Sequence, residues 1–197
     1  MGHVPYFIHG HRAVFRKAPR ALPGTACLVA VLLGLAASGA SAQAIAARKG
    51  TGLPVPRFVS LKSNLVNVRR GASNDHAITA IYKKRGLPVE IVAEWDNWRK
   101  IRDSEGTEGW VWHSLLSGER TALVSPWSGS SEETFHITAE PDSSGRTVAR
   151  VRPGVVVSVK SCDKQWCTVR LTWEKRDYQG FFPQNRLWGV YPDEEFE

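Results

Sequence analysis

Two stretches of the sequence repeat each other, and this repeat decides the fold. Residues 85–118 read RGLPVEIVAEWDNWRKIRDSEGTEGWVWHSLLSG, and residues 153–189 read PGVVVSVKSCDKQWCTVRLTWEKRDYQGFFPQNRLWG. Trp98 aligns with Trp166 at an offset of 68 positions, and the offset becomes 71 after a three-residue insertion within 170–179. An ordered series of aromatic, glycine and aliphatic matches with one small insertion indicates a duplicated module.

Both copies carry the period-two pattern of half-buried strands. In the first copy Val89, Ile91 and Ala93 alternate along the chain, and in the second a valine occupies every other position of 155–159. Pro, Gly, Asp and Asn separate such runs at intervals of roughly eight to twelve residues, as they do in small barrels. We therefore predict an all-β protein with two small β-barrels in tandem.

Composition divides the chain into segments. Residues 125–133 combine proline, glycine, four serines and two acids, which is typical of a linker. We predict a signal segment at 1–42, a flexible lead at 43–56, a first barrel at 57–124, a linker at 125–132 and a second barrel at 133–193. The acidic C-terminal residues 193–197 are expected to be frayed.

The N-terminal segment is organised like an export signal. Residues 1–25 contain four basic residues and no acid, residues 26–37 form an uncharged apolar run, and Ala40-Ser41-Ala42 provides a small-residue cleavage site. The apolar run is shorter than the ~18–20 residues of a spanning helix, and an uncleaved anchor is the alternative. We expect a periplasmic or secreted protein with no membrane span after cleavage.

Net charge gives little support for a nucleic-acid partner. The whole chain carries +7, but the four basic residues of 1–42 account for part of it and the remaining chain carries +3. So small an excess is a weak basis for phosphate-backbone binding, and we predict no nucleic acid among the partners.

Two of the three cysteines lie outside the predicted signal segment. They are Cys162 and Cys167, and they flank a four-residue segment. At the repeat offset they correspond to Glu94 and Arg99, which carry opposite charges. Residues i and i+5 face each other across a four-residue hairpin loop, where an ion pair or a disulfide can form. An even pair of cysteines in an exported chain favours a disulfide. A catalytic thiol and a zinc pair are the alternatives, although no second ligand pair or nucleophile motif accompanies them.

The first copy resembles the bacterial SH3 (SH3b) domain. The resemblance rests on Asn67-Val68-Arg69-Arg70-Gly71-Ala72-Ser73, on Gly86 before a Val-x-Ile strand, on Asn97-Trp98-Arg99-Lys100-Ile101 and on Gly109-Trp110-Val111. The second copy lacks the Asn-Val-Arg start and is assigned mainly through the duplication. The resemblance implies a small, strongly bent SH3-like barrel per copy. It also implies a non-catalytic role in binding peptidoglycan or peptides.

Aromatic residues are the candidate ligand contacts. We interpret Trp110 and the buried face of Trp98 as core, because both recur as aromatics in the second copy. Exposed aromatics in turns and on strands are typical of binding platforms. Ligand-binding groove candidates are Tyr82, Trp95, Trp98 and Trp112.

These patterns favour a binding protein over an enzyme. No phosphate loop, metalloprotease motif or nucleophile elbow is visible, so we assign no catalytic residue, no metal and no cofactor. The leading hypothesis is a non-catalytic envelope protein that binds peptidoglycan or a partner peptide. Alternatives are a structural or assembly factor that pairs with another envelope protein, and a cell-wall hydrolase.

Overall fold

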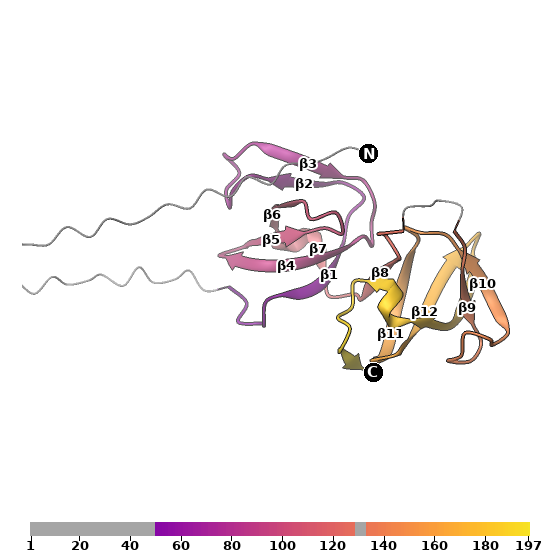
Figure 1. Cartoon of the computed structure of the whole chain (residues 1–197). Helices are drawn as coiled ribbons and strands as arrows, with labels where there is room; N and C mark the ends of the chain where they lie inside the picture. The colour runs from indigo at the N-terminus through magenta and orange to yellow at the C-terminus, as the bar shows by residue number, and fades with distance from the viewer. Residues whose placement is uncertain (1–49, 129–132) are drawn as a thin grey trace, which may run out of the picture. The chain divides into compact units, whose positions relative to one another are not determined.

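The computed structural model describes residues 50–128 and 133–197 (Figure 1). The predicted signal segment at 1–42 and the first part of the predicted lead lie outside the described residues. The described chain forms two antiparallel sheets, and its only helical elements are two single turns of 3-10 helix. The prediction of an all-β protein is therefore confirmed.

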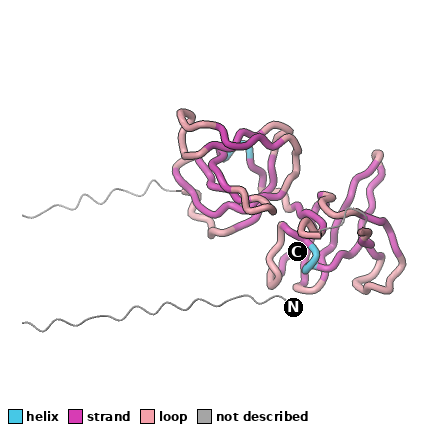
Figure 2. The backbone as a smooth tube through the Cα atoms, turned by 45° about the horizontal axis from the view of Figure 1, so that its top comes forward, coloured by secondary structure: helices cyan, strands magenta, loops and turns pink. Residues whose placement is uncertain are grey.

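The first sheet has seven strands that curl into a barrel (Figure 2). Its spatial order is β3-β2-β6-β5-β4-β1-β7, with a 3-10 turn, η1 (His113–Leu115), between β6 and β7. The strands are β1 (Arg57–Leu61), β2 (Val66–Arg69), β3 (Ile78–Tyr82), β4 (Pro88–Trp95), β5 (Trp98–Arg102), β6 (Glu108–Trp112) and β7 (Leu116–Ser117).

A small aliphatic core fills this barrel. Its buried members come from five neighbouring strands, and all are valine, leucine or isoleucine. They are Leu61, Val66, Val68, Val89, Ile91, Ile101 and Val111. The predicted alternation on β4 thus supplies two core side chains, and the tryptophans of the hairpin lie outside this cluster.

The second sheet repeats the same order with one additional strand. Its main path is β10-β9-β13-β12-β11-β8-β14, and the 3-10 turn η2 (Gln184–Arg186) precedes β14. The strands are β8 (Thr121–Val124), β9 (Phe135–Thr138), β10 (Thr147–Val151), β11 (Val156–Asp163), β12 (Trp166–Trp173), β13 (Arg176–Pro183), β14 (Leu187–Trp188) and β15 (Glu195–Phe196). Its core contains Phe182 and both cysteines beside aliphatic residues.

The register of the strands reproduces the sequence repeat. Ile91 pairs with Ile101 in the first sheet and Val159 with Val169 in the second, and a bulge follows each pair on the first strand. Gly109 on β6 and Gly180 on β13 occupy matching positions, and a larger residue would not fit at either one. A Cβ at Gly109 would collide with the side chain of Val68, as one at Gly180 would with the backbone of Thr138. Glycine therefore lets the crossing strands approach closely.

The strand pairing differs from the sequence-based division of the chain. Residues 121–124, which we assigned to the first barrel, form β8 and pair with β11 and β14 of the second sheet. Residues 125–128, assigned to the linker, follow β8 within the second sheet's own chain path. A loop inside a barrel and a linker between barrels share the same composition, so only the pairing partners distinguish them.

The C-terminal tail also differs from expectation. Instead of fraying, Glu195 and Phe196 form β15 and pair with Asp163 and Cys162 of β11. The carboxylate of Glu194 accepts two hydrogen bonds from the guanidinium of Arg120, at 2.7 and 2.9 Å. The same guanidinium lies 4.6 Å from the centre of the Phe196 ring. These contacts give the acidic tail partners that its composition did not reveal.

Candidate functional site

Three tryptophans form one row across the first sheet. Trp98 pairs with Trp95 across the β4–β5 hairpin and with Trp112 across β5–β6. Directly opposed residues on antiparallel strands point to the same face of a sheet. The structure therefore brings together three of the four predicted groove residues.

The row lies on the outer face of the barrel. Val111, the neighbour of Trp112 along β6, is completely buried in the core, and side chains alternate along a strand. Trp110 and Trp112 therefore share the outward face, as do Trp98 and Lys100 on β5. Trp98 is buried as expected, although on the outward face, whereas Trp110 is only half-buried there and lies outside the core cluster. Alternation fixes which residues share a face and leaves open which face is inside.

The rings of the row form a partly exposed aromatic platform. Trp98 and Trp112 pack edge to face with ring centres 5.3 Å apart, and Trp98 is only 7% exposed. Trp95 and Trp112 are 42% and 36% exposed. The His113 ring lies 5.5 Å from Trp112 at an angle of 49°. A fixed central ring flanked by two accessible indoles can stack on a flat ligand and offer indole N–H donors.

Charged side chains lie beside this platform. Lys100, which pairs with Trp110, forms an ion pair with Glu108. The hydrogen bond from Lys100 lowers the pKa of the Glu108 carboxyl from its ordinary value. The outer face therefore combines aromatic rings with an exposed ammonium and an exposed carboxylate. Both can exchange their partner for polar groups of a ligand.

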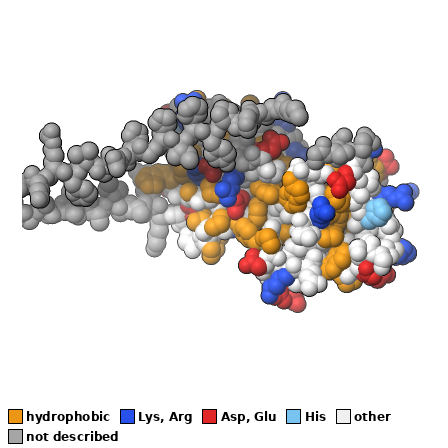
Figure 3. Space-filling view, viewed as in Figure 1, with side chains coloured by type: hydrophobic (Ala, Val, Ile, Leu, Met, Phe, Trp, Pro, Cys, Tyr) orange, Lys and Arg blue, Asp and Glu red, His pale blue; other side chains and the backbone are white. Residues whose placement is uncertain are grey.

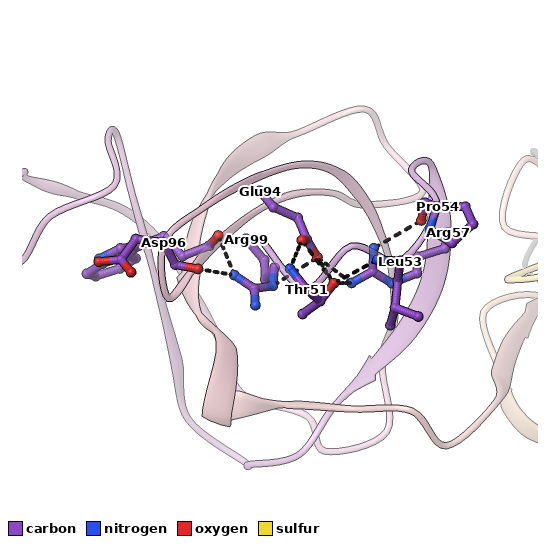
Figure 4. A network of polar contacts seen from close by, with 8 residues as sticks. Thr51, Leu53, Pro54, Arg57, Glu94, Asp96 and Arg99 are labelled. Atoms are coloured by element: carbon purple, nitrogen blue, oxygen red, sulfur yellow. Dashed lines mark hydrogen bonds and ion pairs between the residues drawn. The ribbon is translucent and has the colours of Figure 1, made fainter. Parts of the chain in front are cut away.

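A polar network on the inner face fixes the hairpin that carries the row (Figure 4). Glu94 and Arg99 pair across the strands, and Arg99 Nε lies 3.1 Å from Glu94 Oε1. Arg99 Nη1 also donates to the backbone oxygens of Asp96 and Trp98, at 2.8 and 2.9 Å. One guanidinium thus connects the β4 carboxylate to the turn between Trp95 and Trp98.

Glu94 is the centre of this network. Its side chain is 9% exposed and accepts further hydrogen bonds from Arg57 Nη2 and from Thr51, whose hydroxyl lies 2.8 Å from Oε1. Burial alone would raise the pKa of Glu94, but the hydrogen bonds from Arg57 and Thr51 outweigh it and lower the pKa. Glu94 is therefore held as a carboxylate, and residue 51 of the predicted lead is attached to the barrel.

Tyr82 does not belong to the aromatic row. Its hydroxyl donates to Asp103 Oδ2 at 2.6 Å, just beyond the end of β5, whereas Trp98 begins that strand. Burial and this hydrogen bond raise the pKa of Tyr82. The structure thus separates Tyr82 from the tryptophans by the length of β5. The spacing of these residues along the sequence could not reveal this separation.

The second barrel retains only the centre of the row. At the repeat offsets, Trp95, Trp98 and Trp112 correspond to Asp163, Trp166 and Pro183. The register agrees, because Trp166 pairs with Pro183. A cavity of about 260 Å³ lies here, lined in part by Trp166, Phe135 and Arg186. The two exposed indoles are therefore a feature of the first barrel.

The two hairpins carry different cross-links at the same position. Cys162 pairs with Cys167 across β11 and β12, and their sulfur atoms are 2.00 Å apart, a disulfide bond. Glu94 and Arg99 occupy the matching positions of the first hairpin. The expected disulfide and its ionic counterpart are both present. The ion pair, like the disulfide, is largely buried.

Neither a metal centre nor a membrane helix occurs in the described part of the chain. Within residues 50–128 and 133–197, histidine, cysteine and acidic side chains form no cluster of three or more that could hold a metal ion. In the same residues no helix has the length and apolarity needed to cross a bilayer.

Comparison with known families agrees with this geometry. The family model described as "Bacterial SH3 domain" matches residues 62–118 and 132–189, more than half of the chain. The chain belongs to the bacterial SH3 domain family. Each match begins after the first strand of its sheet, so the structure adds β1 and β8 to the matched SH3 domains.

Solved structures give weaker likenesses. The structure of NlpC1 from Trichomonas vaginalis aligns at 14% identity and a TM-score of 0.31, over 73% of this chain and 49% of that one. NlpC2 from the same organism aligns at 13% identity and a TM-score of 0.31, over 68% and 48%. The chain thus spans about half the length of these proteins. Among curated proteins, the search found no match.

Lys100 and His113, two polar residues near the aromatic platform, were not predicted as site residues. Lys100 was visible only as part of a family-like motif, and its place beside Trp110 follows from the register of β5 and β6. His113 directly follows Trp112, and its tilt against that ring depends on the 3-10 turn that begins there. No spacing signal in the sequence indicates either contact.

Proposed function

We propose that the protein is an exported, non-catalytic binding protein of the bacterial envelope, and that its first SH3 domain binds peptidoglycan through Trp95, Trp98 and Trp112. The observation that carries this proposal is the in-register row of three tryptophans on the outer face, with two indoles accessible. Stacking on sugar or peptide planes is the chemistry that such a surface provides.

Other features support this proposal. A disulfide in the second barrel is typical of proteins that mature outside the reducing cytoplasm. The hairpin that carries the platform is held by the Glu94–Arg99 network, so the rings are ordered before a ligand arrives. Preorganised aromatic side chains lose little conformational freedom on binding, which favours affinity for a flat ligand.

Co-sedimentation with purified cell-wall sacculi tests the proposal. The full chain should be retained, and Trp95→Ala and Trp112→Ala should each reduce retention because each removes an exposed ring of the row. Trp127→Ala is the matched control, since Trp127 is 54% exposed and lies outside the row. Equal retention of all three variants would contradict the proposed site.

The same variants separate the two ligand classes. If the full chain is not retained by sacculi but binds peptides from envelope proteins, and the Trp112→Ala variant loses that binding, the platform is a peptide site. Recovery of the protein only in cross-links to another envelope protein, with no effect of either tryptophan variant, would favour the assembly-factor alternative instead.

A further inference from the structure

The second barrel carries a groove lined mainly by apolar side chains. The β12–β13 hairpin extends to the pair Trp173–Arg176, in the region where the repeat gains three residues. A groove of about 410 Å³ lies between this extension and β10. It is lined by Ala149, Arg150, Val151, Arg152, Val155, Leu171, Trp173 and Tyr178.

The groove is a continuation of the inner face of the barrel. Val169 is completely buried in the core, and alternation puts Leu171 and Trp173 on the same face of β12. Leu171 pairs with Tyr178 of β13, so both strands contribute to this face. The core ends before the hairpin does, and Trp173 is left 64% exposed. Figure 3 shows hydrophobic side chains on the visible surface, with both basic and acidic side chains around them.

The matching place of the first barrel carries a hydrogen bond between polar side chains instead of an apolar lining. The position of Leu171 corresponds to Asp103 at the repeat offset, and Tyr82 ends β3 as Val151 ends β10. The Tyr82 hydroxyl donates to Asp103, and the β5–β6 hairpin ends there. Aliphatic side chains in place of this polar pair and a longer hairpin distinguish the second copy.

The two charged side chains that line the groove are Arg150 and Arg152. The hairpin end beside it carries charges of both signs, with Arg176 paired to Trp173 and Glu174 next to it. No acidic side chain contributes to the lining. Within residues 50–128 and 133–197, neither Arg150 nor Arg152 forms an ion pair. Their guanidinium groups are thus available for carboxylates of a bound molecule.

The strand beside the groove has a free edge. β10 is the terminal strand of its sheet and pairs only with β9. Such an edge offers backbone N–H and C=O groups to an added strand. Along β10, Ala149 and Val151 share one face while Arg150 lies on the other, so an added strand would meet apolar and basic surfaces alternately.

We propose that this groove binds an extended acidic segment of a partner protein, which adds to β10 as a further strand. Alternate apolar side chains of the segment pack against Leu171, Trp173 and Tyr178, and its carboxylates pair with Arg150 and Arg152. The site is separate from the tryptophan row and does not depend on the function proposed for it.

A titration of the full ¹⁵N-labelled chain tests this proposal. The probe is a short synthetic peptide that alternates glutamate with valine or phenylalanine. Binding should shift the Trp173 indole signal and protect β10 amides from exchange. Trp173→Ala should weaken binding at least about tenfold, as loss of a buried aromatic anchor does. Trp127→Ala, the matched exposed tryptophan, should leave binding unchanged.

Further variants keep the test decisive. Arg150→Glu combined with Arg152→Glu leaves the core intact and should abolish binding, and a peptide with lysine in place of glutamate should not bind. Absence of binding, equal binding of the lysine peptide, or shifts without protection of β10 amides would overturn the proposal. A response of Trp173 to soluble peptidoglycan fragments and not to the acidic peptide would likewise overturn it and assign the groove to the wall.

Discussion

Glu94 is the residue on which the first hairpin depends. Its carboxylate is nearly buried and connects three residues. They are Arg57 on β1, Arg99 on β5, and Thr51 in the segment before β1. A buried charge is stable only while its partners are present, and removing one partner leaves the others uncompensated. The carboxylate therefore stabilises the fold while it orders the turn that carries Trp95 and Trp98.

Glu94→Gln should reduce the free energy of unfolding by about 2 kcal/mol at neutral pH, because it removes the charge that Arg57 and Arg99 face. The folded-state pKa of Glu94 is lowered, so its contribution is complete above the unfolded-state value of about 4.3 and is lost as pH falls through the folded-state pKa. Urea unfolding at a series of pH values measures the difference between the two proteins.

Glu108→Gln provides the control for this experiment. Glu108 also pairs with a cation and also has a lowered pKa, but it lies at the surface. Its replacement should change the urea midpoint far less than that of Glu94, because solvent screens an exposed pair. A Glu94→Gln effect that stays constant from neutral to acid pH would contradict the assigned role of the carboxylate.

At the scale of elements, the two matching hairpins are stabilised by different cross-links. A barrel of about 60 residues buries only about 60% of its chain surface and gains from a local cross-link. The first hairpin is joined by the Glu94–Arg99 pair and the second by the Cys162–Cys167 bond, at the same register. Asp96 and Lys164, in the two turns, both adopt positive φ angles.

Replacing Cys162 and Cys167 by serine should destabilise the second barrel by about 2 kcal/mol, the loop-entropy value for a bond that closes about six residues. Urea unfolding monitored at NMR signals of each barrel measures this loss. The first barrel's signals should keep their midpoint if the effect is local. An unchanged midpoint in the second barrel would show that the bond contributes nothing to its stability.

The equivalence of the hairpins also predicts that a disulfide can be introduced into the first hairpin. Glu94→Cys combined with Arg99→Cys places two thiols at the register of the natural pair, so they should oxidise to a disulfide in air. Intact mass should fall by two hydrogens relative to the reduced protein. Two thiols that both react with an alkylating agent without prior reduction would contradict the equivalence.

Sequence predicted much of this architecture for identifiable reasons. The duplication fixed the matching of Glu94 and Arg99 to the cysteines, because both lie in regular hairpins. It did not reveal that residues 121–124 begin the second sheet, since a four-residue strand gains its identity from its partners β11 and β14. Which face of β5 and β6 lies inside also depends on the closed barrel, so the outward direction of Trp98 and Trp110 required the structure.

At the scale of the whole molecule, the two SH3 domains have diverged in which surface carries aromatic residues. The first has Trp95 and Trp112 exposed beside Trp98, and Tyr82 forms a hydrogen bond with Asp103 beyond the far end of β5. The second has Asp163 and Pro183 at the matching positions, and its extended hairpin exposes Trp173. The two SH3 domains thus present different exposed aromatic surfaces in one chain.

Indole signals provide the most direct test of the central claim that the tryptophan row of the first domain is the ligand site. The full ¹⁵N-labelled chain is titrated with soluble peptidoglycan fragments while the side-chain N–H signal of every tryptophan is followed. We predict that the signals of Trp95 and Trp112 shift with a common saturation curve, while those of Trp127 and Trp173 do not move. Shifts confined to tryptophans outside the row, or equal small shifts of all of them, would contradict the account.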